Sequence, residues 1–290
     1  MIPRFALSRP RTLDEAFDAF AASDGEGAWI AGGTELLQVM KMGLAQFRDL
    51  IDIKALEPLR GIHADGDGLH IGALTTHREI ERSPDIARAF PGMAAMARRV
   101  ANVRVRSTGT IGGNLAFAEP HSDPATLLLA SDASVRLCGP AGERSVSIAD
   151  FVLGPLSTAR EADEMLLGID IPAAAPSTGR AYDKIAFFER PAASVAVRLT
   201  IADGTVASAT VAVGSVGEIP ERVEEAARRL EGITASEEAL SDALPAVIDA
   251  LGAIDAVDDL NGSPDYKRHL AGVLLASTSR AALREASADV

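Results

Sequence analysis

Cysteine and clustered histidine, the usual ligands of metals, are almost absent from this chain. Cys138 is the only cysteine, so the chain by itself cannot form a disulfide, a zinc site of several thiolates or a cysteine-ligated iron–sulfur cluster. Its neighbours Leu137 and Gly139 lie in an apolar run, which predicts a buried thiol. The five histidines show no ligand spacing such as HxxxH. We therefore predict no metal site in this chain.

Basic charge and long apolar runs are also in short supply. The chain has 28 Lys+Arg against 41 Asp+Glu, a net charge of −13, which disfavours nucleic acid as a partner. The one dense basic run comprises Arg98, Arg99, Arg104 and Arg106, and we interpret Arg104 and Arg106 as exposed rather than partner-facing. No stretch approaches the ~18 apolar residues that span a bilayer, and the first residues lack a secretory signal. These absences predict a cytoplasmic protein without a membrane span.

The chain has enough apolar residues for a well-buried core. It is 290 residues long and 47% hydrophobic, a size that predicts two or three domains. The mixture of strand and helix patterns along the chain predicts the α+β class. Residues 1–56 predict a small α/β unit: a helix capped by Thr12, a strand over 28–31, a glycine turn, a helix from Thr34 to Met42, and a strand over 50–53.

The rest of the chain predicts two further units. Residues 57–177 have short strands separated by turns, interrupted by one helix over 92–100, and residues 173–179 are typical of a linker. Residues 178–290 predict a sheet followed by helices near 220–231, 236–251 and 264–277. In the last helix, the apolar residues Leu270, Val273, Leu274 and Leu275 fit either the domain's own core or a partner interface.

Two glycine loops carry the chemistry of the sequence. Gly32 and Gly33 follow a strand and precede a helix, so that backbone N–H groups can point at an anion such as a phosphate, with Thr34 as helix cap or ligand donor. An ordinary strand-to-helix turn is the alternative. The second loop, residues 107–116, combines hydroxyls, glycines and an amide with little bulk, and is neither a P-loop nor GxGxxG. Two such loops predict a pyrophosphate held from both sides, and hence a dinucleotide cofactor.

The order of several motifs resembles a known family along essentially the whole chain. The motifs are Ala31–Thr34, Ile71–Thr76, Thr110–Asn114, Glu119–Pro124, Asp163–Leu166 with Ile171 and Pro172, Tyr182–Lys184 and Tyr266–Leu270. Together they resemble the medium, FAD-binding subunit of carbon monoxide dehydrogenase and its xanthine dehydrogenase relatives.

The resemblance implies a fold and a division of labour. The expected fold has two FAD-binding subdomains of the vanillyl-alcohol-oxidase type, residues 1–56 and 57–177, and a separate C-terminal α+β domain, residues 178–290. The implied function is an oxidoreductase subunit that carries FAD and transfers electrons. A small subunit would carry iron–sulfur clusters and a large subunit the molybdenum cofactor, in a hetero-oligomer that is a dimer of heterotrimers.

The resemblance also implies cofactor-binding residues. Those expected at the pyrophosphate are Ala31, Gly32, Gly33, Thr34, Glu35 and Leu36 in the first loop, and Thr110, Ile111, Gly112, Gly113 and Asn114 in the second. Asp123 matches a carboxylate near the cofactor, Leu166 an apolar contact and Lys184 a lysine near the flavin ring. The alternatives are a turn or helix start for Asp123 and a solvated strand lysine for Lys184. His121 is a further acid–base candidate, but no catalytic residue is identified.

Two differences from some relatives bear on how the FAD is attached and on whether this chain holds an extra iron–sulfur cluster. Thr34 stands where some relatives have a histidine, and residues 115–118 contain none of the cysteines that some relatives insert for an extra cluster. The FAD is therefore expected to be non-covalent. A self-contained FAD oxidoreductase acting on its own small substrate, and an interaction protein without cofactor, remain the competing functions. The substrate of the complex and its terminal electron acceptor do not follow from the sequence.

Overall fold

The N-terminal unit is built on a small parallel sheet. The computed structural model describes residues 2–187 and 190–288. In the first sheet the strand order is β1-β3-β2, all parallel, with Ala28 of β2 opposite Leu50 of β3. The elements of this unit are β1 (Ala6–Ser8), α1 (Leu13–Ala21), β2 (Gly27–Ile30), α2 (Leu36–Lys41), β3 (Asp49–Asp52) and the 3-10 helices η1 (Ile53–Ala55) and η2 (Glu57–Leu59). Thr12 caps α1 as predicted, because its side chain accepts a hydrogen bond from the N–H of Glu15.

The middle unit has an antiparallel sheet in the order β4-β5-β10-β6-β7. Its strands are β4 (Ile62–Ala64), β5 (Gly68–Gly72), β6 (Ser134–Gly139), β7 (Gly142–Ser147) and β10 (Met165–Pro172), with α9 (Ile148–Phe151) and the pair β8 (Val152–Gly154) and β9 (Ser157–Thr158) after β7. Cys138 is buried in the core between this sheet and the first unit, as predicted. Burial raises the pKa of its thiol.

Helices are far more frequent in the middle unit than the sequence predicted. Between β5 and β6 the chain forms six of them, where only the one over 92–100 was expected. They are α3 (His77–Arg82), α4 (Pro84–Ala89), α5 (Pro91–Arg98), α6 (Val103–Thr108), α7 (Ile111–Phe117) and α8 (Asp123–Ala130). Each is only six to eight residues long, too short for apolar periodicity to stand out. Helices α4 and α5 begin with proline, and α8 has proline as its second residue, positions that suit a helix start.

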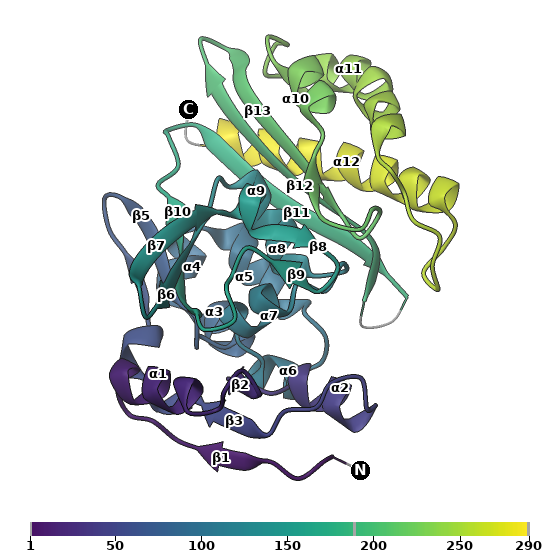
Figure 1. The fold of residues 1–290 in the computed structure, drawn as a ribbon. Coiled ribbons are helices and arrows are strands. Elements are labelled where there is room, and N and C mark those ends of the chain that lie inside the picture. The colour runs from purple at the N-terminus through teal and green to yellow at the C-terminus, as the bar shows by residue number, and fades with distance from the viewer. Residues whose placement is uncertain (1, 188–189, 289–290) are drawn as a thin grey trace.

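The C-terminal unit is an antiparallel meander covered by helices. Its strands β11 (Thr178–Ala186), β12 (Pro191–Ala202), β13 (Thr205–Gly214) and β14 (Glu221–Arg222) pair in sequence order. They are followed by α10 (Glu224–Leu230), α11 (Glu237–Asp249), the 3-10 helix η3 (Ala250–Ala253) and α12 (Pro264–Ser287). Helix α12 lies along the sheet (Figure 1). Leu270, Leu274 and Leu275 pack into this unit's core, whereas Val273 is 52% exposed.

The C-terminal sheet is buried on both faces, which joins it to the middle unit. Side chains alternate along β12, so Val195 and Val197 enter the core beneath α12 while Ala196 enters the core of the middle unit. On that second face β13 runs against α8 at very short range: a Cβ on Gly214 would lie 2.0 Å from the Thr126 hydroxyl. The C-terminal unit therefore forms one wall of the region that follows the second glycine loop.

Candidate functional site

The first glycine loop connects β2 to α2. Gly33 has φ +69°, a left-handed conformation that favours glycine, and it reverses the chain between the strand and the helix. Glu35 occupies the N-cap position of α2, and its side chain makes no capping hydrogen bond. Thr34 was predicted as a possible cap, and this is wrong, because the helix begins one residue later than that role requires. Its hydroxyl therefore stays available for another partner.

The backbone of this loop carries unpaired donors. Within residues 2–187 and 190–288, the N–H groups of Gly32, Gly33, Thr34 and Glu35 donate no hydrogen bond. The residues themselves are only half-buried. Four successive free N–H groups ahead of a helix form a site that suits an anionic oxygen, the chemistry of a phosphate.

The second glycine segment lies directly against the first. A Cβ built on Gly32 would be 2.0 Å from the carbonyl oxygen of Thr108, so only glycine permits this approach. A Cβ on Gly113 would be 4.0 Å from the Cβ of Ala31, and one on Gly109 would be 3.4 Å from the Thr34 hydroxyl. The structure thus brings together two segments that are about 75 residues apart in the sequence.

The second segment was predicted as an open loop of phosphate donors, and this is wrong for residues 111–114. They form the first turn of α7, and their N–H groups are all used within the fold. Ile111 donates to Thr75, Gly112 to Ala73, Gly113 to the Thr110 hydroxyl and Asn114 to the Thr110 carbonyl. Among the described residues, the N–H of Thr110 and the side-chain NH₂ of Asn114 donate no hydrogen bond. The segment can contact a ligand chiefly through these two groups.

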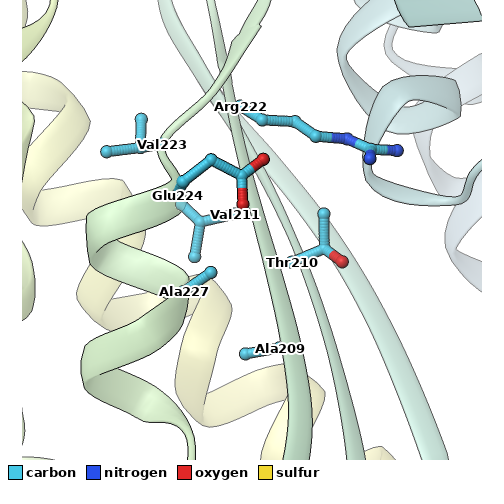
Figure 2. Close-up of a pocket in the computed structure, with 7 residues that line it drawn as sticks. All are labelled: Ala209, Thr210, Val211, Arg222, Val223, Glu224 and Ala227. Carbon is cyan, nitrogen blue, oxygen red and sulfur yellow. The ribbon is translucent and has the colours of Figure 1, made fainter.

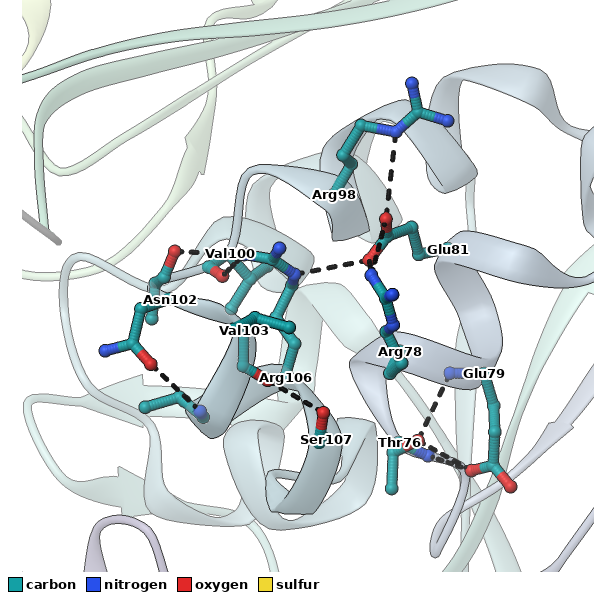
Figure 3. A network of polar contacts seen from close by, with 12 residues as sticks. Thr76, Arg78, Glu79, Glu81, Arg98, Val100, Asn102, Val103, Arg106 and Ser107 are labelled. Atoms are coloured by element: carbon teal, nitrogen blue, oxygen red, sulfur yellow. Dashed lines mark hydrogen bonds and ion pairs between the residues drawn. The ribbon is translucent and has the colours of Figure 1, made fainter.

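A cluster of charged side chains packs next to the second segment. Arg106 on α6 contacts Glu81 at 3.2 Å and donates to the carbonyls of Val100 and Ala101, and Arg78 and Arg98 meet the same carboxylate (Figure 3). Arg106 was predicted to be exposed, and this is wrong, because its side chain is only 13% exposed; Arg104 is exposed.

His77 packs behind the same segment. Its N–H donates to the carbonyl of Gly109, and its side chain is buried with Nδ1 unpaired among the described residues. Burial, helped by the charge of Arg106, lowers the pKa of His77 to about 4. A neutral imidazole therefore fills the space beneath the segment at neutral pH.

Asp123 and Lys184 form a buried ion pair. The Lys184 Nζ lies 2.7 Å from Asp123 Oδ2, and both side chains are 5% exposed. The reading of Lys184 as a solvated lysine is therefore wrong. Tyr182 donates its phenol to the other oxygen of Asp123 at 2.5 Å. Burial and the neighbouring carboxylate raise the pKa of the Tyr182 phenol well above its usual value, so it remains a donor.

This ion pair is connected to the second glycine segment. Asp123 starts α8, directly after Ser122, whose hydroxyl donates to the side-chain oxygen of Asn114 at 2.6 Å. Burial raises the pKa of Asp123, and Lys184 opposes that shift. Tyr182 was not predicted as a site residue, although it and Lys184 are two positions apart on β11 and therefore face the same side of the strand.

Leu36 and Leu166 lie at the margins of this arrangement. Leu36 is the first residue of α2 and packs, half-buried, against the small core formed by Ile30, Met40 and Leu50. Leu166 on β10 is 5% exposed and belongs to the core of the middle unit, which also contains Ile111. Both therefore support the segments that carry the polar groups.

One hollow elsewhere in the described chain is too small for a dinucleotide. A hollow of about 40 Å³ lies between β13 and the start of α10 (Figure 2), a volume suited to water rather than a dinucleotide. It is lined by Ala209, Thr210, Val211, Arg222, Val223, Glu224 and Ala227. Residues 2–187 and 190–288 contain no group of three or more metal-ligating side chains. Nor does any helix in these ranges combine the length and hydrophobicity needed to cross a membrane.

Two family models together match most of the chain. Residues 3–174 match the family model for the FAD binding domain in molybdopterin dehydrogenase, and residues 189–282 match the CO dehydrogenase flavoprotein C-terminal domain. The carbon monoxide dehydrogenase medium chain of Hydrogenophaga pseudoflava is 34% identical over 97% of both chains. The nicotine 6-hydroxylase medium subunit of Paenarthrobacter nicotinovorans is 32% identical over 96% of both.

Solved structures show the same fold. The carbon monoxide dehydrogenase of Hydrogenophaga pseudoflava that lacks the Mo-pyranopterin moiety of its cofactor superposes with a TM-score of 0.92, at 33% identity, over 98% of this chain and 99% of that chain. Quinoline 2-oxidoreductase from Pseudomonas putida 86 superposes with a TM-score of 0.89, at 28% identity, over 100% and 99% of the two chains. The predicted fold of a two-part FAD-binding region with a C-terminal α+β domain is confirmed.

The fold and the family match thus define a flavoprotein of the oxidoreductase class, with FAD as its cofactor. More particularly, the chain belongs to the family of FAD-binding medium subunits of the molybdopterin dehydrogenases, which includes the carbon monoxide dehydrogenase medium chains.

Proposed function

We propose that this chain is the electron-transfer subunit of a molybdenum-containing hydroxylase, taking electrons from an iron–sulfur subunit and passing them to an external acceptor. The observation that carries the proposal is the row of four unpaired N–H groups at Gly32–Glu35, lying against the second glycine segment in a chain that belongs to this family. When bound, the flavin supplies the redox chemistry, and the protein supplies position and electrostatics.

The proposed contacts follow the geometry. Residues 31–36 hold the pyrophosphate through backbone N–H groups and the Thr34 hydroxyl, and residues 110–114 contribute mainly the Thr110 N–H and the Asn114 amide. Neither segment contains a histidine or cysteine that could attach the flavin covalently. We therefore expect non-covalent FAD, which acid precipitation tests: FAD should appear in the supernatant, and flavin that stays with the protein pellet would contradict this expectation.

The Asp123–Lys184 pair is proposed to lie near the flavin ring, as the family resemblance implies. The Lys184 ammonium can influence the charge of a flavin ring bound nearby. Because Asp123 neutralises it, the pair adds no unpaired charge to the protein interior. Tyr182 keeps the carboxylate oriented through its second oxygen. Leu166 is proposed as an apolar contact from the core beneath. The three larger sheets support the proposed subdomains 1–56, 57–177 and 178–290, since their strands fall within residues 6–52, 62–172 and 178–222.

The proposed partners are a small subunit with iron–sulfur clusters and a large subunit with the molybdenum cofactor, assembled as a dimer of heterotrimers. The names of the relatives support this, because they are medium chains or subunits of dehydrogenases and hydroxylases. The single cysteine of this chain fits a division of labour in which the clusters lie elsewhere. We infer that the complex works in the cytoplasm.

Stopped-flow reduction tests the proposed function. The isolated flavoprotein should stay oxidised when mixed with small aldehydes, purines or aromatic heterocycles, and should bleach when its partner subunits and the right substrate are added. Co-purification from the native host identifies those partners. Rapid bleaching by a small substrate without partners would instead favour a self-contained oxidoreductase.

A further inference from the structure

A row of charged side chains leads away from the first glycine loop toward the C-terminal unit. Arg190, just before β12, lies 3.6 Å from the carboxylate of Glu35 in that loop. The same guanidinium forms an ion pair with Glu119, which follows α7. Glu119 in turn meets His121, whose Nδ1 lies 2.8 Å from Glu119 Oε1. Glu35 in the first glycine loop is thereby connected, through Arg190 and Glu119, to His121 in the middle unit.

The row continues from the other side of the same imidazole. His121 Nε2 lies 3.0 Å from Asp259 Oδ2, and the amide of Asn261 lies 3.1 Å from the same nitrogen. Asp259 Oδ2 also accepts a hydrogen bond from Lys267 on α12 at 2.5 Å. The Lys267 side chain is 1% exposed, which anchors this end of the row in the C-terminal core.

The charges in the row balance only when His121 is protonated. Three carboxylates, of Glu35, Glu119 and Asp259, then face three cations, of Arg190, His121 and Lys267. A neutral imidazole can donate from only one nitrogen, so one of its two carboxylate partners would lose its hydrogen bond. Burial lowers the pKa of His121, but Glu119 and Asp259 outweigh burial and raise it.

We propose that His121 is a positioning residue for the cofactor: as an imidazolium held between Glu119 and Asp259, it clamps the C-terminal unit onto the first glycine loop. The restraint passes through Glu119 and Arg190 to Glu35, next to the free N–H groups of the loop. The inference rests on the proposed binding of FAD at that loop. Since the clamp needs the proton, it is complete below the ordinary pKa of about 6.5 and weakens as the pH rises through the raised pKa of His121.

The test compares His121→Gln with the matched variant His70→Gln in the full-length chain. His70 also sits between two carboxylates, with Nδ1 2.8 Å from Asp170 and Nε2 3.5 Å from Asp65, but on the middle sheet. Two quantities are measured from pH 6 to pH 9: the Kd of FAD by flavin fluorescence, and hydrogen exchange of residues 31–36 in the apoprotein. In the wild type and in His70→Gln, Kd should rise with pH by roughly tenfold, the factor for one charge-assisted hydrogen bond.

In His121→Gln, Kd should be high at every pH and residues 31–36 should exchange faster than in the wild type at pH 6. If this variant unfolds, Arg190→Gln, at a half-exposed side chain, should reproduce the faster exchange with the fold intact. The clamp would be overturned if the Kd of FAD depended on pH in the same way in the wild type and in His121→Gln, and if hydrogen exchange of residues 31–36 were unchanged. A wild type that binds no FAD would instead contradict the proposed function, while the exchange of the apoprotein would still decide the clamp.

Discussion

The two glycine segments look alike in the sequence, yet their backbones are used differently. In residues 32–35 four N–H groups are unpaired among the described residues, whereas in residues 111–114 all four are hydrogen-bonded within the fold. Gly33 is needed for its left-handed φ of +69°, but Gly32 and Gly112 are needed because the neighbouring backbone lies where a side chain would be. A glycine in the sequence therefore indicates that another group lies close to the backbone, but it does not show whether that group belongs to a ligand or to the protein itself.

The difference assigns the segments separate tasks. The first offers donors to a phosphate, whereas the second has hydrogen bonds that connect α7 to the segment 73–75. The two segments meet where the Thr108 carbonyl lies against Gly32. Substitutions in the second segment, and at Gly32 where the Thr108 backbone lies against it, should therefore act on folding stability. Substitutions at Gly33 or Thr34 should act chiefly on cofactor affinity.

Within the second segment, the largest effect on stability is expected for Gly112→Ala. The new Cβ would lie 2.6 Å from the Cβ of Ala73 and 2.7 Å from its carbonyl oxygen, and neither atom can move without the backbone. Overpacking of this kind costs about 1–3 kcal/mol, measured by denaturant unfolding. Gly252→Ala is the control, because nothing lies within 4 Å of its Cβ. Equal stabilities of the two variants would show that the segment around Ala73 can accommodate the added Cβ, contrary to this prediction.

Gly33→Val should chiefly weaken FAD binding. A branched residue strains the left-handed conformation and would turn the free N–H groups away, so the Kd should rise by about 100-fold, the loss of roughly two charge-assisted hydrogen bonds. Gly43→Val is matched in backbone strain, with φ +77° and open space around the Cβ, but lies beyond α2. Should both variants retain FAD equally well, the loop would be an ordinary turn.

Two threonines give the smallest and most selective contrast. Thr110→Val removes the hydroxyl that caps α7 and should cost about 1 kcal/mol of stability, with little change in FAD affinity because the backbone N–H remains. Thr34→Val removes a hydroxyl that is not a cap, and should leave stability unchanged while raising the Kd of FAD about fivefold, the value of one neutral hydrogen bond. Calorimetric unfolding of both variants measures the loss of stability, and fluorescence titration measures the Kd of FAD. If the two loops had equivalent roles, the two variants would change stability and Kd alike.

Much of the fold followed from local sequence patterns. The helix capped by Thr12 and the strands β2, β5, β12 and β13 have strong periodicity, and each was predicted within a residue or a few. The missed helices α3 and α6 had readable signals, since Thr76 and Glu79 form a capping box and Asn102 caps α6. Their short length hid them from an argument based on apolar spacing.

Other features of the site depend on contacts that local patterns do not contain. Lys184 is buried because it meets Asp123, 61 residues away, and Gly32 is constrained by the carbonyl of Thr108. The hydrogen bonds that occupy the N–H groups of Ile111 and Gly112 come from the segment 73–75. Each of these partners is fixed by tertiary packing, so residue type alone could indicate a candidate but not its role.

Amide chemical shifts test the central claim most directly. In a ¹⁵N-labelled chain titrated with FAD, the N–H resonances of Gly32, Gly33, Thr34 and Glu35 should move downfield as they begin to donate to the pyrophosphate. Those of Ile111, Gly112 and Gly113 should stay nearly constant, because their partners do not change. Large shifts at residues 111–113 without shifts at residues 32–35 would contradict the assignment of the first loop as the pyrophosphate site.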